Sequence, residues 1–267
     1  MDIRASKCPH LKWEEVSDSI RKYTCLSTNP VAITLFKRRE DIHNLTTLKY
    51  VGRRTNICQM IPIVRYSKDA SAICTFRENI ACVWGAACLG LIKTPGRFLD
   101  GSIYMDFVKD KEAALKLQQS VATLGKEGKK YEAIVCAPLS ATPVEPQAIV
   151  AYVSPAQALR LIIASAYHTG ESVEASTVGQ ASVCSSIAKA ILKNKPNLEI
   201  PCIGDRVFGY VQDNEMIFSF PAEFAEQLVK GLKATERSAH YPYYPYLERF
   251  IIMPNIRWET SQEDLNL

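Results

Sequence analysis

The sequence predicts an α/β fold in which two pseudo-symmetric βαβαβ-like repeats pack into one body around a mixed sheet. Three observations predict it. Short apolar, β-branched segments alternate with segments that have helical spacing. After about residue 129, the same order of strand and helix signals starts again. The chain has 267 residues, 47% of them hydrophobic, which is enough to bury a core of this size.

The first repeat is predicted at residues 29–128, after a helical lead-in at residues 1–28. The segment PVAITLF, from Pro30, has the continuous apolar character of a buried strand. Asp110 is a predicted helix cap, and Gly125 ends that helix. The other elements expected in this repeat are a helix at 58–66, a strand at 71–75, a helix at 78–91 and a strand at 101–108.

The second repeat is predicted at residues 129–236, followed by an irregular C-terminal extension at 237–267. Ser154 and Pro155 form a strong helix start, because serine caps a helix and proline suits its first position. The other expected elements are strands at 132–138, 146–153, 173–178, 206–211 and 215–220, and helices at 182–192 and 224–232.

The spacing of matching features also indicates an internal duplication. Cys184 lies 102 positions after Cys82, and Val207 lies 104 positions after Ile103, where both residues are expected to begin strands. The two offsets differ by only two residues, which favours an internal repeat. A shared architecture without common origin is the alternative. If the halves pack about a pseudo-twofold axis, Cys82 and Cys184 are expected to meet near it.

The composition excludes several classes of protein. A net charge of +4 is too small to mark a nucleic-acid binder, and the basic runs at 37–39 and 126–130 are short. No apolar run is long enough for a membrane span, and the first residues lack a signal peptide. We therefore expect a cytoplasmic protein that binds neither nucleic acid nor membrane.

Cysteine is the residue type that points to chemistry. The chain has nine cysteines, and in a reducing compartment they are not expected to form disulfides. Four thiolates suit an iron–sulfur cluster or a structural zinc ion, because both prefer soft sulfur ligands. No C-x-x-C pair occurs, which argues against a zinc ribbon. The candidate ligands, called here the four-cysteine set, are Cys58, Cys82, Cys184 and Cys202.

Several segments carry a family resemblance. In chain order they include PVAITLF, ENIACVWGAACLGL, APLSATP, PAQALRLIIASAY, SVCSSIAKAI, LEIPCIGDR and DNEMIFSFP. Over about residues 28–235 the chain resembles the uncharacterised archaeal cysteine-rich family, which is domain-of-unknown-function family 169. The resemblance implies that the four-cysteine set acts as a unit, and it implies no activity.

Three functions follow from this set. The leading hypothesis is an iron–sulfur protein with a [4Fe-4S] cluster on Cys58, Cys82, Cys184 and Cys202. One form of this hypothesis is an enzyme that uses the cluster as Lewis acid or redox centre on a small molecule. The second is a haem or cluster protein for sensing or for electron transfer to a partner protein. The third is a metal-free binder of small molecules. Arg206 is a candidate for holding an anionic substrate, and a salt bridge to Asp205 or Glu215 is its alternative role.

Overall fold

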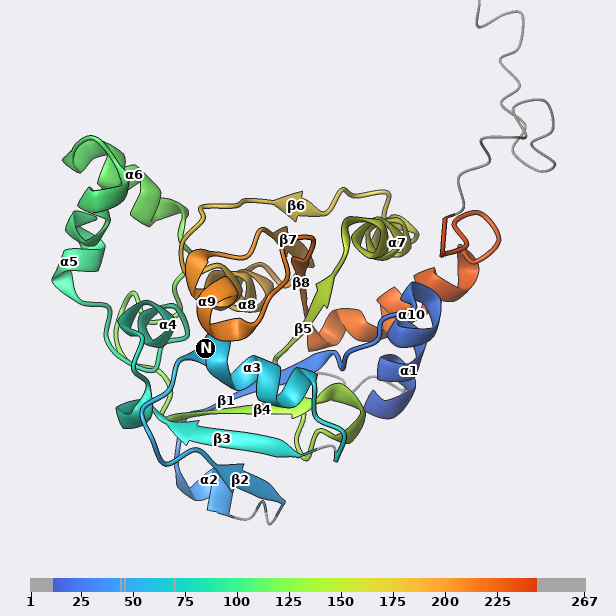
Figure 1. Cartoon of the computed structure of the whole chain (residues 1–267), viewed down its shortest axis with the longest axis horizontal. Coiled ribbons are helices and arrows are strands. Elements are labelled where there is room, and N and C mark those ends of the chain that lie inside the picture. The colour runs from blue at the N-terminus through green and yellow to red at the C-terminus, as the bar shows by residue number, and fades with distance from the viewer. Residues whose placement is uncertain (1–11, 44, 46, 70, 244–267) are drawn as a thin grey trace, which may run out of the picture.

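The computed structural model describes residues 12–43, 45, 47–69 and 71–243, and its centre is one mixed sheet of eight strands (Figure 1). The strand order is β2-β3-β4-β1-β5-β8-β7-β6. Neighbouring strands are antiparallel except for β2 with β3 and β6 with β7, which are parallel. The predicted α/β class with a mixed sheet is therefore confirmed.

The first half of the sheet follows a helix at the N-terminal side, α1 (Trp13–Thr24). Its strands alternate with short helices, as the sequence pattern predicted. In order they are β1 (Val31–Phe36), α2 (Glu40–His43), β2 (Leu48–Tyr50), α3 (Ile57–Arg65), β3 (Ala72–Phe76), η1 (Arg77–Asn79), α4 (Val83–Cys88), α5 (Gly96–Leu99), η2 (Ser102–Phe107), α6 (Lys111–Ser120) and β4 (Ala133–Pro138). Asp110 caps α6 as expected, since its Oδ1 accepts from the Ala113 N–H at 2.9 Å.

The second half begins after the short 3-10 helix η3 (Leu139–Ala141). Its elements are β5 (Ala148–Val153), α7 (Pro155–Ala166), β6 (Glu174–Ala175), α8 (Ser182–Lys193), β7 (Asn197–Glu199), α9 (Ile203–Gly209), β8 (Met216–Pro221), η4 (Ala222–Phe224) and α10 (Ala225–Ala234). Ser154 and Gln157 form a capping box at the start of α7. The predicted extension at 237–267 lies mostly outside the described residues.

The two halves have the same strand order and the same pairing senses. From one edge the sheet runs β2-β3-β4-β1 and from the other edge β6-β7-β8-β5, and the antiparallel pair β1 and β5 joins them. This topology pairs α3 with α8 and α4 with α9. It agrees with the idea of two related halves, while a repeat that superposes in three dimensions stays a prediction.

The topology corrects the predicted register of the repeat. The offset of 102 residues set Cys82 against Cys184, but Cys82 precedes α4 and Cys184 lies in α8, and these two helices are not equivalent. The equivalent residues are Cys58 with Cys184, in the first turns of α3 and α8, and Cys82 with Cys202, directly before α4 and α9. The offset was wrong because α5, η2 and α6 have no counterpart between α9 and β8.

Two predicted strands are helical. Residues 101–108 contain η2, because Gly101 turns the chain in a left-handed conformation (φ 76°) and the Ser102 N–H bonds to Asp100 Oδ1. Residues 206–211 lie largely in α9, whose first turn is fixed when Asp205 Oδ2 accepts from the Cys202 N–H at 3.1 Å. Predicted helix 78–91 is shorter than expected, because α4 begins only at Val83.

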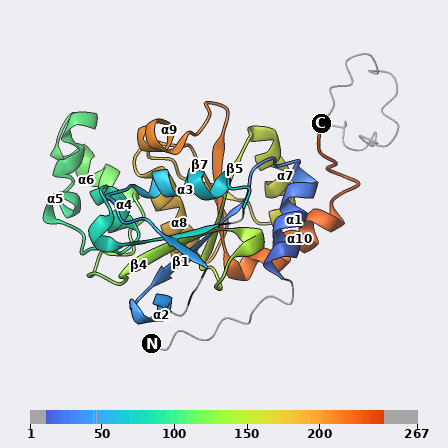
Figure 2. The same cartoon turned by 60° about the horizontal axis from the view of Figure 1, so that its bottom comes forward.

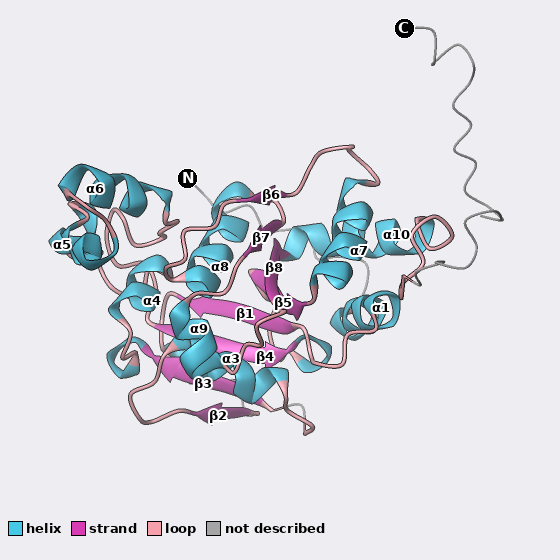
Figure 3. Cartoon of the chain, turned by 45° about the horizontal axis from the view of Figure 1, so that its top comes forward, coloured by secondary structure: helices cyan, strands magenta, loops and turns pink. Residues whose placement is uncertain are grey.

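Helices cover both faces of the sheet. On one face, α3, α4 and α8 pack against the side chains of Ile33, Val150 and Ile217 from the central strands. On the other face, α1, α7 and α10 pack against Ile149 and Phe218. Figures 1, 2 and 3 show α5 and α6 at one end of the molecule and the group α1, α7 and α10 at the opposite end.

Contacts between the halves bring the starts of four helices together. The helix α3 of the first half packs against α9 of the second, and α4 of the first half packs against α8 of the second. Figure 1 shows α3, α4, α8 and α9 as one central group. None of the helices within the described residues is long and apolar enough to cross a membrane.

Candidate functional site

The four-cysteine set lines a single cavity of about 260 Å³, which we call the thiol cavity. Each cysteine comes from a different helix of the central group, two from each half of the sheet. The cavity is far larger than the roughly 10–15 Å³ needed for one water molecule, so it can take a group of several atoms. Cys58 and Cys184 are buried, and Cys82 and Cys202 are partly exposed.

The local sequence places each cysteine at the start of a helix. Cys58 is the second residue of α3, which begins with a capping box between Asn56 and Gln59. Cys184 is the third residue of α8. Cys82 and Cys202 are themselves the capping residues of α4 and α9. The Gly85 N–H donates to Cys82 Sγ at 3.4 Å, so this sulfur already accepts a backbone hydrogen bond.

Two glycines leave room between the sulfur atoms. A Cβ atom added to Gly204 would lie 3.6 Å from Cys202 Sγ and 3.9 Å from Cys58 Sγ. A Cβ added to Gly85 would lie 3.2 Å from Cys184 Sγ and 3.9 Å from Cys82 Cβ. The sulfurs of Cys58 and Cys202 therefore approach a common point across the α3 and α9 contact. Because glycine has no side chain, a space stays open beside the sulfurs at both positions, and any larger residue would fill part of it.

Asp205 is a buried carboxylate on the wall of the thiol cavity, with a side-chain exposure of 1%. Its Oδ2 accepts from the backbone N–H groups of Cys202 at 3.1 Å and Val183 at 3.3 Å, and from Cys202 Sγ at 3.4 Å. It thus ties α8 to α9 beside the thiols. Its Oδ1 has no hydrogen-bond partner among the described residues.

Burial favours the protonated form of Cys58, Cys184 and Cys202 in the metal-free protein. Burial raises the pKa of Cys58, Cys184 and Cys202, and the nearby Asp205 carboxylate raises each of them further. Burial also raises the pKa of Asp205 to about 6, against the hydrogen bonds that lower it. Among the described residues that line the cavity, none is a lysine, arginine or histidine that could compensate several thiolates.

The arrangement differs from that of a compact single-ion site. Among the described residues, no group of three or more Cys, His, Asp or Glu side chains is placed to hold one metal ion. In a tetrahedral zinc site with Zn–S bonds of about 2.3 Å, the four sulfurs must crowd around one point. The four thiols here line a cavity of about 260 Å³.

The other predicted site residue, Arg206, does not line the thiol cavity. Its Nη1 donates to the Gln212 carbonyl at 3.0 Å and to Asp213 Oδ1 at 3.3 Å. Neither of the two predicted partners forms a salt bridge with Arg206. Asp205 accepts a hydrogen bond from Cys202, and Glu215 pairs with the buried Arg65. Arg206 is therefore a surface residue whose ion pair closes the loop after α9.

The remaining described cysteines lie outside the cavity wall. Cys74 and Cys136 sit in the strands β3 and β4, and Cys25 is exposed after α1. Cys88 is buried at the end of α4, close enough to affect the pKa of Cys184 but not lining the cavity. Cys8 falls outside the described residues.

Sequence reasoning missed the parts of the site that only packing reveals. Asp205 was considered only as a salt-bridge partner, although its position three residues after Cys202 is the spacing of a capping box. That spacing was the one available signal. Trp84, Phe107 and Gln180 also line the cavity, and nothing in their local sequence indicated it.

Comparison with known proteins gives a family and no function. The model of the family described as "Uncharacterised ArCR" matches residues 19–231. An uncharacterised protein of Methanocaldococcus jannaschii is 31% identical over 208 residues, which cover 76% of this chain and 86% of that protein. No solved structure matches the chain significantly.

Proposed function

The chain belongs to the uncharacterised ArCR family, and we propose that it is an iron–sulfur protein whose cluster, of the [4Fe-4S] type, is held by the thiols that line the cavity. The proposed ligands are Cys58, Cys82, Cys184 and Cys202. The observation that carries the proposal is the convergence of these four cysteines, from four helices, on one cavity. Packing alone gives no reason for four thiols to share a partly open space.

The charge of the cavity supports a metal-containing group. Ligating thiols must lose their protons, and four thiolates close together repel one another in a buried site. The described residues of the cavity wall supply no cationic side chain to offset that charge. Iron ions supply the positive charge that offsets the thiolates, and sulfur is the ligand type that iron–sulfur clusters require.

The space between the thiols supports a cluster over a single zinc ion. Gly85 and Gly204 leave the centre of the cavity open. In a [4Fe-4S] cluster each cysteine binds a different iron atom, so the sulfurs lie farther apart than around one ion.

Such a cluster, when bound, supplies one-electron transfer, or a Lewis-acid site if one iron is left without a cysteine. The residues of this chain would then hold and orient it. The Gly85 N–H already bonds to Cys82 Sγ, and hydrogen bonds to ligating sulfur raise the reduction potential of a cluster. Asp205 would orient Cys202 through its two backbone hydrogen bonds.

Anaerobic purification followed by iron and sulfide analysis tests the proposal. We expect about four iron and four acid-labile sulfide per chain, with a broad absorbance near about 400 nm. Zinc in place of iron would indicate a structural metal. No bound metal after reconstitution with iron and sulfide would contradict the proposal and favour the metal-free binder.

Single cysteine variants test the ligand assignment. Cys82→Ser and Cys184→Ser are each expected to abolish the absorbance, since each removes one ligand. Cys136→Ser and Cys88→Ser are the controls, because both thiols are buried but lie outside the cavity wall. Cys88 is the sharper control, since it lies in the same helix that Cys82 caps. Equal loss in all four variants would show that the ligands are wrongly assigned.

A further inference from the structure

A second and larger pocket lies between α3, the loop after β2 and the end of α9. We call it the arginine pocket. Its volume of about 650 Å³ falls within the roughly 300–1,000 Å³ typical of sites for small molecules. The residues that define its chemistry are Arg53, Arg54, Gln59, Tyr66, Phe208 and Tyr210.

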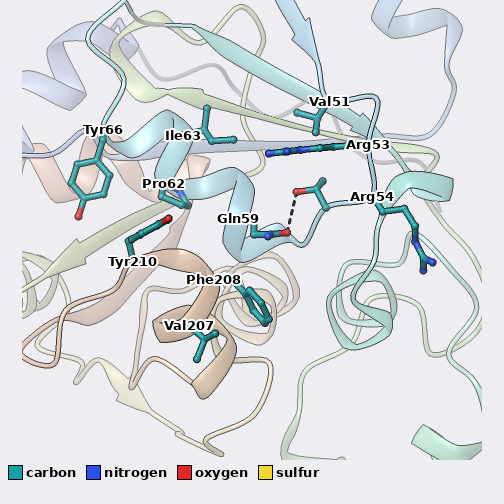
Figure 4. A pocket seen from close by; sticks show the side chains of 11 residues that line it. Val51, Arg53, Arg54, Gln59, Pro62, Ile63, Tyr66, Val207, Phe208 and Tyr210 are labelled. Carbon is teal, nitrogen blue, oxygen red and sulfur yellow. Dashed lines mark hydrogen bonds between the residues drawn. The ribbon is translucent and has the colours of Figure 1, made fainter.

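The pocket carries positive charge that the protein does not neutralise. Within the part of the chain that the structure describes, no acidic residue lines the pocket, and neither Arg53 nor Arg54 has an ion pair or side-chain hydrogen bond. Figure 4 shows Arg53 extended across the pocket toward Ile63, whereas Arg54 points away from it. Arg53 is therefore positioned to pair with an anionic group inside the pocket.

The walls of the pocket are apolar and aromatic. Pro62 and Ile63 of α3, with Tyr66 directly after that helix, form one side of the pocket, and the rings of Phe208 and Tyr210 at the end of α9 lie on the facing side (Figure 4). Tyr210 is 71% exposed and has a left-handed backbone (φ 52°), a conformation that costs roughly 1 kcal/mol for a residue other than glycine. An exposed ring held at such a position is available for contact with a ligand.

From this geometry we infer that the arginine pocket binds a small organic acid, whose carboxylate pairs with Arg53 and whose flat apolar body lies against the aromatic rings. A guanidinium group can bind both oxygens of a carboxylate through two parallel hydrogen bonds. The volume leaves room for a body of about one or two rings.

The position of the pocket relates it to the thiol cavity without depending on a metal. Phe208 lines both the arginine pocket and the thiol cavity. Gln59 of the pocket follows Cys58 of the cavity in α3. An acid in the arginine pocket would therefore lie next to whatever the thiols hold, yet its binding can be measured whether or not iron is present.

The test compares two matched probes, 2-naphthoate and the neutral 2-naphthamide, by titration calorimetry on the full chain as purified under anaerobic conditions. We expect 2-naphthoate to bind saturably and about tenfold more tightly than 2-naphthamide. Arg53→Gln is expected to weaken 2-naphthoate by about tenfold and leave 2-naphthamide unchanged, and Arg53→Lys to recover part of the loss. Tyr210→Ala is expected to weaken both probes.

The matched control is Arg97→Gln, which removes the same charge from an exposed site in α5, far along the chain from the pocket. It should leave both affinities unchanged. Equal affinity for the two probes, or the same response to Arg53→Gln and Arg97→Gln, would overturn the inference. Because Arg53 is exposed, the Arg53→Gln variant is expected to fold, which thermal unfolding checks.

Discussion

The first turns of α4 and α9 occupy equivalent positions in the two halves, but they treat their cysteines differently. Cys82 is followed three residues later by Gly85, and Cys202 by Asp205. Both sulfurs accept a backbone N–H from the residue three positions later, and only the Cys202 sulfur also faces a buried carboxylate. A common scaffold thus positions the thiols, and the Asp205 side chain adds a carboxylate beside the thiol of one half only.

The halves also differ in what supports the cavity from outside. The first half adds α5, η2 and α6, and Phe98 of α5 packs its ring edge to face with Trp84 of the cavity wall at 5.5 Å. The second half has only a short loop between α9 and β8. Aromatic packing therefore braces the cavity from the first half, and the hydrogen bonds of Asp205 brace it from the second.

The largest effect is expected from pH, which should change the iron affinity of the cavity thiols that both halves contribute. Because burial raises the pKa of Cys58, Cys184 and Cys202, these thiols are protonated near neutral pH in the metal-free protein. Binding iron releases their protons, so iron affinity should rise with pH by about 1.4 kcal/mol per unit for each thiol that loses a proton. The fraction of iron kept against a competing chelator, measured from about pH 6.5 to 9, checks this.

A flat retention of iron across that range would mean that the thiols are already ionised. As a control, a thiol-modifying reagent should react first with Cys25, because this thiol is exposed and lies outside the cavity.

The aromatic brace of the first half is tested by Phe98→Ala. Phe98 is 2% exposed and contacts both Trp84 and Tyr104, so its removal leaves a cavity in the core. The free energy of unfolding should fall by about 3 kcal/mol. Urea unfolding followed by tryptophan fluorescence measures it. The neighbouring Leu99→Ala is the control, since Leu99 is exposed and should cost less than about 0.5 kcal/mol.

The hydrogen-bond brace of the second half is tested by Asp205→Ala. The change leaves the N–H groups of Cys202 and Val183 without their acceptor, one of them fully buried. We expect the free energy of unfolding to fall by about 2 kcal/mol. Asp213→Ala removes an exposed carboxylate of the same loop region and should change it by less than about 0.5 kcal/mol. Similar losses in both variants would remove the proposed role of Asp205.

The smallest effect on stability is expected from Gly204→Ala. Its Cβ would meet the sulfurs of Cys202 and Cys58 at ordinary contact distances, and alanine favours a helix over glycine by about 0.5–1 kcal/mol. The variant should therefore be as stable as the native chain or slightly more so. Iron content should nevertheless fall, because the methyl group occupies the space between two proposed ligands. Full iron content in this variant would place the cluster elsewhere.

Much of the fold could be predicted from local signals, and the errors have physical causes. The capping residues Asp110 and Ser154 marked helix starts correctly, because a cap acts within one turn. Residues 206–211 were predicted to form a strand, which is wrong for Val207 and Phe208. They lie in a helix and are exposed, since Asp205 fixes the first turn.

What the sequence alone determined is the α/β class, the positions of most strands and helices, and which cysteines to consider together. These follow from periodicity, from caps and from the resemblance to a family. What only the tertiary structure decided is the correspondence between the halves, the place of Asp205 on the cavity wall, and the arginine pocket beside it. These depend on the pairing of strands and the packing of α3 on α9 and α4 on α8, contacts between residues far apart in the chain that no local pattern records.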